Sequence, residues 1–195
     1  QEVVFSKITE TAQHDSFQAL ARIVKLTLVT ELIGASLLSI AFILEGKTFL
    51  NAVWEGVFTA VSAFCNAGFS LQSNNLTPYA LNPFILSTIS LLIVIGGLAP
   101  ATTILFPQWI RRKPIPVPAA LAFQTSLILL IIGFLFSLTL EWNGLLKEFG
   151  LADKLSNAWF LSSTLRTAGF NSFDLAFVSS PLYLIMLFLM FVGGS

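Results

Sequence analysis

The sequence predicts an all-α membrane protein made of two tandem units, each a span, a pore loop and a second span. Composition supports the membrane class: of 195 residues, 55 % are apolar and only 10 % are charged, against about 25 % charged in soluble domains. Residues 56–110, 114–140 and 175–195 contain no charged residue, and uncharged apolar runs of 18 or more residues are candidate spans. The net charge of zero offers no basic face to nucleic acid.

A repeated motif supports the tandem units. Residues 62–71 read SAFCNAGFSL and residues 163–172 read STLRTAGFNS, so Gly68 aligns with Gly169. One such turn is explained equally well by a tight interhelical turn or a small-residue packing contact. Two turns, each set between longer apolar runs, predict a repeated re-entrant pore loop.

The first unit is expected at residues 22–110, after a polar cytoplasmic connector, or frayed surface helix, at residues 1–21. Its first span covers residues 23–44. Residues 52–64 are too short an apolar segment to cross a bilayer and suit a re-entrant helix. A second span is expected at residues 83–106, interrupted by Gly96-Gly97, where close helix packing is the favoured interpretation, and by Pro100.

The second unit repeats this order at residues 118–195. A basic loop at 111–117 contains Arg111, Arg112 and Lys113, and short Lys/Arg-rich loops stay cytoplasmic. A third span (118–140), a second short helix (154–165) and a last run from Pro181 follow. The chain opens with Gln1, and its last helix would reach only about 22 Å, short of a hydrocarbon core of about 30 Å. We therefore expect a fragment of a longer chain that ends within its last span.

The order of helix and turn predicts the sign of the bound ion. Each short helix precedes its glycine turn, so its C-terminal end, about half a negative charge, faces the turn. Turn carbonyls replace the hydration shell of a cation, and neither turn contains an acidic residue, which favours a monovalent ion over a divalent carboxylate site. The only acidic residue placed within a span is Glu31, and without a His or Asp pair an enzyme is not expected.

Arg166 stands where the first motif has Cys65. A cation beside a cation site either pairs with a carboxylate and braces the loop, or weakens the field of the site. Bracing is the favoured interpretation, with Asp174 as the nearest acidic partner by sequence and a partner outside the chain as the alternative.

At these residues the chain resembles the Trk/Ktr/HKT potassium transporters, with the greatest likeness to the membrane subunit of bacterial Ktr systems. The resemblance rests on residues 62–70, 166–172 and 190–195, with further likeness at 31–35 and at the approach from Arg22 to Lys25. It implies four span–loop–span units around a pseudo-fourfold pore, of which this chain contains the second and third. Gly68 and Gly169 match filter glycines, and the implied ion-binding filter consists of Asn66, Ala67, Gly68, Phe69, Thr167, Ala168, Gly169 and Phe170.

The resemblance also implies a gate and partners. Gly193, Gly194 and Ser195 match the start of an intramembrane gating loop. The family forms homodimers on a cytoplasmic ring of nucleotide-binding regulatory subunits, which residues 1–21 and the Arg111–Lys113 loop could meet. Glycine in both filter segments fits potassium, whereas serine in a filter is linked to sodium preference.

The sequence therefore predicts a multi-pass plasma-membrane protein, embedded in lipid, that takes up K⁺ by channel-like passage through backbone carbonyls. A sodium-selective relative, or one that uses Na⁺ as coupling or activating ion, is the first alternative. A non-conducting membrane scaffold whose glycine turns merely pack is the second.

Overall fold

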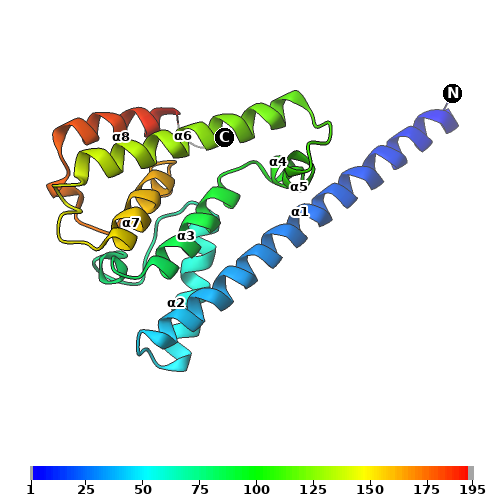
Figure 1. The fold of residues 1–195 in the computed structure, drawn as a ribbon. Helices are drawn as coiled ribbons and strands as arrows, with labels where there is room; N and C mark the ends of the chain where they lie inside the picture. Colours follow the sequence, from blue (N-terminus) through cyan, green and yellow to red (C-terminus); the bar gives the residue numbers. More distant parts are fainter. Residues whose placement is uncertain (1, 193–195) are drawn as a thin grey trace.

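The computed structural model describes the backbone of residues 2–192 and the side chains of residues 17–100 and 102–192. Within this part of the chain every regular element is a helix, which confirms the all-α fold class (Figure 1). In order they are α1 (Glu2–Leu44), α2 (Phe49–Phe64), η1 (Thr77–Tyr79), α3 (Pro83–Gly96), α4 (Pro100–Thr103), α5 (Phe106–Ile110), α6 (Val117–Glu141), α7 (Leu151–Thr164), η2 (Leu175–Phe177) and α8 (Ser180–Val192).

Two helices have the length and composition of a membrane span. They comprise Phe17–Leu44, which is the greater part of α1, and Val117–Glu141, which is α6. Helix α1 runs without a break through residues 21 and 22, where the connector was expected to end, and its N-terminal half stands away from the other helices (Figure 1). The remaining helices are each shorter than a span.

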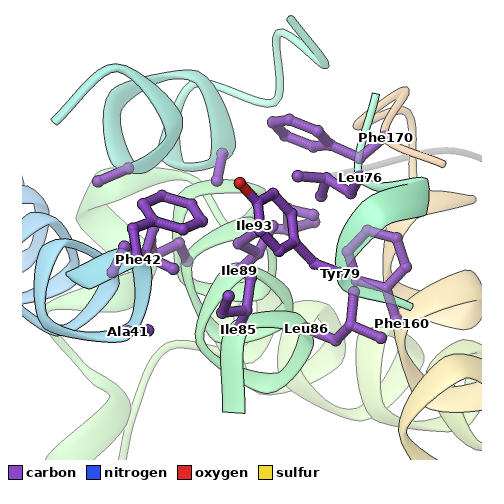
Figure 2. Packing of buried hydrophobic residues seen from close by; sticks show 14 of the residues in the cluster. Ala41, Phe42, Leu76, Tyr79, Ile85, Leu86, Ile89, Ile93, Phe160 and Phe170 are labelled. Carbon is purple, nitrogen blue, oxygen red and sulfur yellow. The ribbon is translucent and has the colours of Figure 1, made fainter. Parts of the chain in front are cut away.

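In the first unit α2 packs along the C-terminal half of α1, and α3 packs against both. Small residues bring α1 and α2 close together: a Cβ placed on Gly56 would lie 2.8 Å from the backbone nitrogen of Ser39. The apolar faces of these helices pack against one another and form the larger core. The close packing of these side chains holds the unit together. The core is completed by side chains from the return segment, Leu76 and Tyr79 (Figure 2).

In the second half of the chain α7 and α8 both pack against the long helix α6, as α2 and α3 both pack against α1. Again a glycine and a serine meet where the long and short helices cross. The Ser162 hydroxyl on α7 donates to the Leu130 carbonyl oxygen on α6 at 2.6 Å, and a Cβ on Gly133 would lie 3.1 Å from the Ser162 Cβ.

The two units are joined by packing of α7 on α3. Phe160 from α7 and Phe170 from the turn after it are fully buried in the core of the first unit (Figure 2). At the same junction the Asn157 side-chain amide donates to the Ala80 carbonyl oxygen at 2.7 Å. The second short helix thus packs both on α3 of the first unit and on α6 of its own.

The segment expected as one interrupted span at 83–106 forms three pieces: α3, α4 and α5. Helix α3 ends at Gly96, and α4 and α5 begin at or beside prolines, which lack the amide that would continue a helix. Gly96 confirms the packing interpretation of the glycine pair, because a Cβ there would lie 2.7 Å from the Phe64 carbonyl carbon at the end of α2.

Candidate functional site

Each short helix leads into a turn, after which the chain returns to the C-terminal end of the preceding long helix. In the first unit Asn82, the N-cap of α3, donates its side-chain amide to Glu45, the residue after α1. In the second unit the Ser179 amide donates to Glu141, the last residue of α6, at 2.9 Å. The chain that leaves the end of each long helix therefore returns to that end, with the short helix and its turn forming the excursion.

The first turn, at residues 65–70, has a backbone that neither a helix nor a strand can adopt. Asn66 has φ 51° and Gly68 has φ 72°, so two of three successive residues lie in the left-handed region. Glycine accepts this region freely and asparagine tolerates it better than most residues.

The second turn has the same pattern. Thr167 has φ 72° and Gly169 has φ 82°, at the positions that align with Asn66 and Gly68. A β-branched residue with positive φ is strained, and strained backbone collects at functional sites because the surrounding structure must hold it there.

The two turns lie directly against each other. A Cβ placed on Gly68 would lie 2.8 Å from the Cα of Gly169 and would overlap the Ala168 carbonyl oxygen. A Cβ on Gly169 would lie 3.5 Å from the Cα of Gly68, which is ordinary contact. The close approach therefore depends on the missing side chain of Gly68 more than on that of Gly169.

Several carbonyl groups in these turns have no partner within the part of the chain that the structure describes. In the first turn they belong to Asn66 and Ala67, and in the second to Thr167, Ala168 and Gly169. Of these residues Ala168 is buried and Asn66 is half-buried, whereas Ala67, Thr167 and Gly169 are exposed. Free carbonyls at the C-terminal ends of two helices are chemically suited to coordinate a cation.

The neighbouring phenylalanine carbonyls are already engaged. The Ser62 hydroxyl donates to the Phe69 carbonyl oxygen and the Thr164 hydroxyl donates to that of Phe170, each at 2.8 Å. These bonds turn both carbonyls toward the short helices, so a role for Phe69 and Phe170 as ion ligands stays a prediction. The side chains differ as well, because Phe69 is 69 % exposed and Phe170 is fully buried.

The hydroxyl bonds reveal a shift that the aligned sequences conceal. Ser62 aligns with Ser163, but the Ser163 hydroxyl bonds within its own helix, to the Trp159 carbonyl oxygen at 3.0 Å. Thr164, one residue later, makes the bond equivalent to that of Ser62. Correspondingly α7 ends one residue earlier than α2 in the aligned sequences, at Thr164 rather than Leu165.

Arg166 is buried beside the second turn, with 7 % of its surface exposed. Its Nε has no hydrogen-bond partner, and no carboxylate among the described side chains lies within 4.0 Å of it. Asp174, the partner suggested by sequence, instead accepts a hydrogen bond from the Ala176 amide at 2.9 Å and caps η2. The pairing of Arg166 with Asp174 is therefore wrong.

Sequence reasoning missed a polar network beside the first turn. Glu55 on α2 is buried and pairs with Lys47, and its carboxylate also accepts from Tyr79 at 2.9 Å and from Gln72 at 3.1 Å. The sequence placed only Glu31 within a span and led us to expect it as the one buried acid. This is wrong, because Glu55 and Glu141 are buried and Glu31 is only half-buried. The signal in the sequence was Glu55 itself, the one charged residue in the apolar segment 52–64.

The predicted start of the gating loop, Gly193, Gly194 and Ser195, lies outside the described residues. Among those that are described, no group of three or more His, Cys, Asp or Glu side chains could hold a metal ion.

An all-helical chain with two apolar helices long enough to cross a bilayer is typical of a helical membrane protein. The model of the family described as "Cation transport protein", TrkH, matches residues 5–195. The chain belongs to this family, which confirms the resemblance to Trk/Ktr transporters.

Curated relatives agree with the family. The potassium/sodium uptake protein NtpJ of Enterococcus hirae is 36 % identical over 174 residues, which is 89 % of this chain and 38 % of that protein. Ktr system potassium uptake protein B of Bacillus subtilis is 35 % identical over 168 residues, 84 % of this chain and 37 % of that protein. The protein of the same name from Vibrio alginolyticus is 29 % identical over 179 residues, 89 % of this chain and 39 % of that protein. The chain thus spans less than two fifths of the length of these relatives.

Proposed function

We propose that this chain forms part of the ion path of a transporter that takes up K⁺ across the plasma membrane through backbone carbonyls. The observation that carries the proposal is the pair of adjoining turns, in which the carbonyls of Asn66, Ala67, Thr167, Ala168 and Gly169 have no hydrogen-bond partner among the described residues. The names of its relatives, which are potassium or potassium/sodium uptake proteins, support the same ion.

Electrostatics supports a cation of single charge. The helices α2 and α7 both end at these turns, and the C-terminal end of a helix holds about half a negative charge. Two such ends attract a cation without the full charge of a carboxylate, which a Ca²⁺ site uses. A weakly held ion is also one that can leave, as conduction requires.

The proposal includes the arrangement implied by the family. The two units, at 22–110 and 118–195, supply the second and third of four filter segments around one multi-pass pore, with 1–21 and 111–117 on the cytoplasmic side. Gly193, Gly194 and Ser195 begin a gating loop below the filter. The complete subunit forms a homodimer that meets a nucleotide-binding regulatory ring. The two adjoining turns support this, because side-by-side segments are what a ring requires.

Arg166 braces the second turn in this arrangement. A buried guanidinium without a carboxylate partner costs several kcal/mol, so we infer that its partner lies in a part of the transporter beyond the described residues. Arg166 directly precedes Thr167 in the sequence, and Thr167 has a strained backbone with φ 72° that needs support.

Sodium is the alternative ion, favoured by one observation: a relative at 36 % identity is a potassium/sodium uptake protein. Sodium as coupling ion and sodium as sole transported ion both agree with carbonyl ligands.

Growth at low K⁺ tests the proposal. The complete protein is expressed in cells that lack potassium uptake, as wild type and as Gly68→Ser and Gly169→Ser. Wild type restores growth and both variants reduce it if the turns form the filter. Growth that is indifferent to both substitutions rejects the filter, and a sodium flux without a potassium flux favours the alternative ion. A wild-type protein that reaches the membrane but conducts neither ion supports the scaffold.

A further inference from the structure

The return segment after the first turn touches both turns through a single side chain, that of Asn75. Its Nδ2 donates to the Gly68 carbonyl oxygen, a long bond at 3.4 Å. Its Oδ1 accepts from the Asn171 backbone amide, directly after the second turn, at 3.2 Å. One amide group therefore bonds to Gly68 of the first unit and to Asn171 of the second.

We propose that Asn75 is a positioning residue that fixes the spacing of the two turns and thereby contributes to ion selectivity. The inference rests on the proposed transport function, because spacing matters only if an ion passes between the turns. Carbonyl ligands discriminate between ions through their number and position, and a site with an unsupported shell becomes too loose to do so.

The clamp is itself held in place. Leu76, the next residue, is 1 % exposed, and its amide donates to the Asn171 carbonyl oxygen at 3.0 Å. Its side chain packs in the same cluster as Phe170 (Figure 2). The Ser70 hydroxyl donates to the Asn75 carbonyl oxygen at 3.3 Å. Asn75 thus extends from a buried anchor and not from a free loop.

The backbone of Asn75 offers a simpler explanation that has to be separated from the clamp. Its φ is 55°, and asparagine is common in the left-handed region because its short amide tolerates it. If this were its whole role, glycine would serve as well or better. The two amide bonds to Gly68 and Asn171 are what glycine lacks.

The clamp is present once in the described chain. Four residues beyond the end of the aligned motif, the same offset of 101 residues places Asn75 at Ala176, which has no side-chain donor or acceptor. Asn75 also lines an open recess of about 570 Å³ between the two return segments, together with Asn171 and Asp174. A change at Asn75 therefore acts at the junction of the two units.

The test compares Asn75→Gly and Asn75→Asp in the complete protein, reconstituted in vesicles, by the ratio of K⁺ to Na⁺ flux. Asn75→Gly keeps the left-handed backbone and removes both amide bonds. Asn75→Asp keeps the shape and the acceptor for Asn171 but places an oxygen against the Gly68 carbonyl. The controls are Asn74→Gly and Asn74→Asp. Asn74 is exposed, and these substitutions make the same change in backbone flexibility or in charge one residue away from Asn75.

Both Asn75 variants should lower the K⁺ to Na⁺ flux ratio, because Asn75→Gly removes both hydrogen bonds and Asn75→Asp replaces the bond to the Gly68 carbonyl with repulsion between two oxygens. The expected fall is about tenfold, which corresponds to about 1.4 kcal/mol. The Asn74 variants should retain the wild-type ratio. An unchanged ratio in Asn75→Gly, or a lower amount of protein with an unchanged ratio, overturns the clamp. If Asn75→Gly does not reach the membrane, the isosteric Asn75→Asp decides. Wild type that transports no K⁺ rejects the proposed function itself, which is a distinct result.

Discussion

Substituting alanine at the two turn glycines should give unequal effects, although the sequence presents the two glycines as equivalent. Both have positive φ, 72° at Gly68 and 82° at Gly169, and the left-handed region costs an alanine about 1–2 kcal/mol. Only at Gly68 would the new Cβ overlap the neighbouring turn, where it would lie 2.8 Å from the Gly169 Cα. Overpacking of this kind adds about 1–3 kcal/mol. We expect Gly169→Ala to cost about 1–2 kcal/mol and Gly68→Ala about 2–5 kcal/mol.

Gly46→Ala isolates the backbone contribution. Gly46 has φ 88°, and a Cβ there would meet no atom within 4 Å. Thermal unfolding of the complete protein in detergent measures the stability of each variant, and K⁺ uptake in cells measures transport. Gly46→Ala should lose about as much stability as Gly169→Ala but transport K⁺ normally. Gly68→Ala should show the largest loss of stability and the largest loss of K⁺ uptake. If Gly169→Ala is more damaging than Gly68→Ala, the turns do not approach each other as described.

Three further predictions follow from contacts near the turns. Thr164→Val removes the hydroxyl that bonds to the Phe170 carbonyl, so it should lower K⁺ selectivity and cost about 1 kcal/mol of stability. Ser163→Ala, at the position that aligns with Ser62, should leave selectivity unchanged. A flux assay in which Ser163→Ala is the more damaging variant would contradict the assigned hydroxyl bond. Gly96→Ala should strongly reduce the amount of folded protein, because its Cβ would meet the end of α2. Gly97→Ala should have a milder effect, because the φ of −72° at Gly97 suits any residue. Protein yield from membranes measures both effects. Burial lowers the pKa of the Lys47 ammonium, but its hydrogen bonds to Glu55 and Tyr79 and the Glu55 charge outweigh burial and raise the pKa above its ordinary 10.5. The folded state then holds this proton more tightly than the unfolded state does. The stability that Lys47→Gln loses should therefore be constant below pH 10.5 and disappear as the pH rises further. A difference in stability that stays constant above that pH would contradict the pairing.

Sequence predicted the helices well because their signals are local. Apolar runs, the prolines before α3 and α6, and the turn at Gly68 and Gly169 all act within a few residues of where they occur. The composition likewise indicated helices that face lipid, and α6 has the length and hydropathy to span a bilayer. The family followed from the same residues, since both glycine turns belong to the matched region.

The contacts that shape the candidate site could not be predicted in this way, because they join residues far apart in the sequence. Asn75 and Asn171 meet only after α7 has packed on α3. Gly68 and Gly169 look alike in sequence, yet only Gly68 lacks room for a side chain. Likewise the shift from Ser163 to Thr164 depends on where α7 ends, and helix ends are the least certain feature of a sequence-based prediction.

This difference explains why two units with the same motif need not perform the same part of the task. The first turn exposes Phe69 and is bonded by the Asn75 side chain at Gly68, whereas the second turn buries Phe170 in the core of the first unit and follows the buried Arg166. A carbonyl site made from such unequal segments has ligands of unequal stiffness. We therefore expect substitutions at the first turn to alter selectivity at smaller cost in stability than equivalent substitutions at the second, where Phe170→Ala alone should cost about 3–5 kcal/mol. Paired flux and unfolding measurements on Phe69→Ala and Phe170→Ala test this, and equal loss of stability in both would refute it.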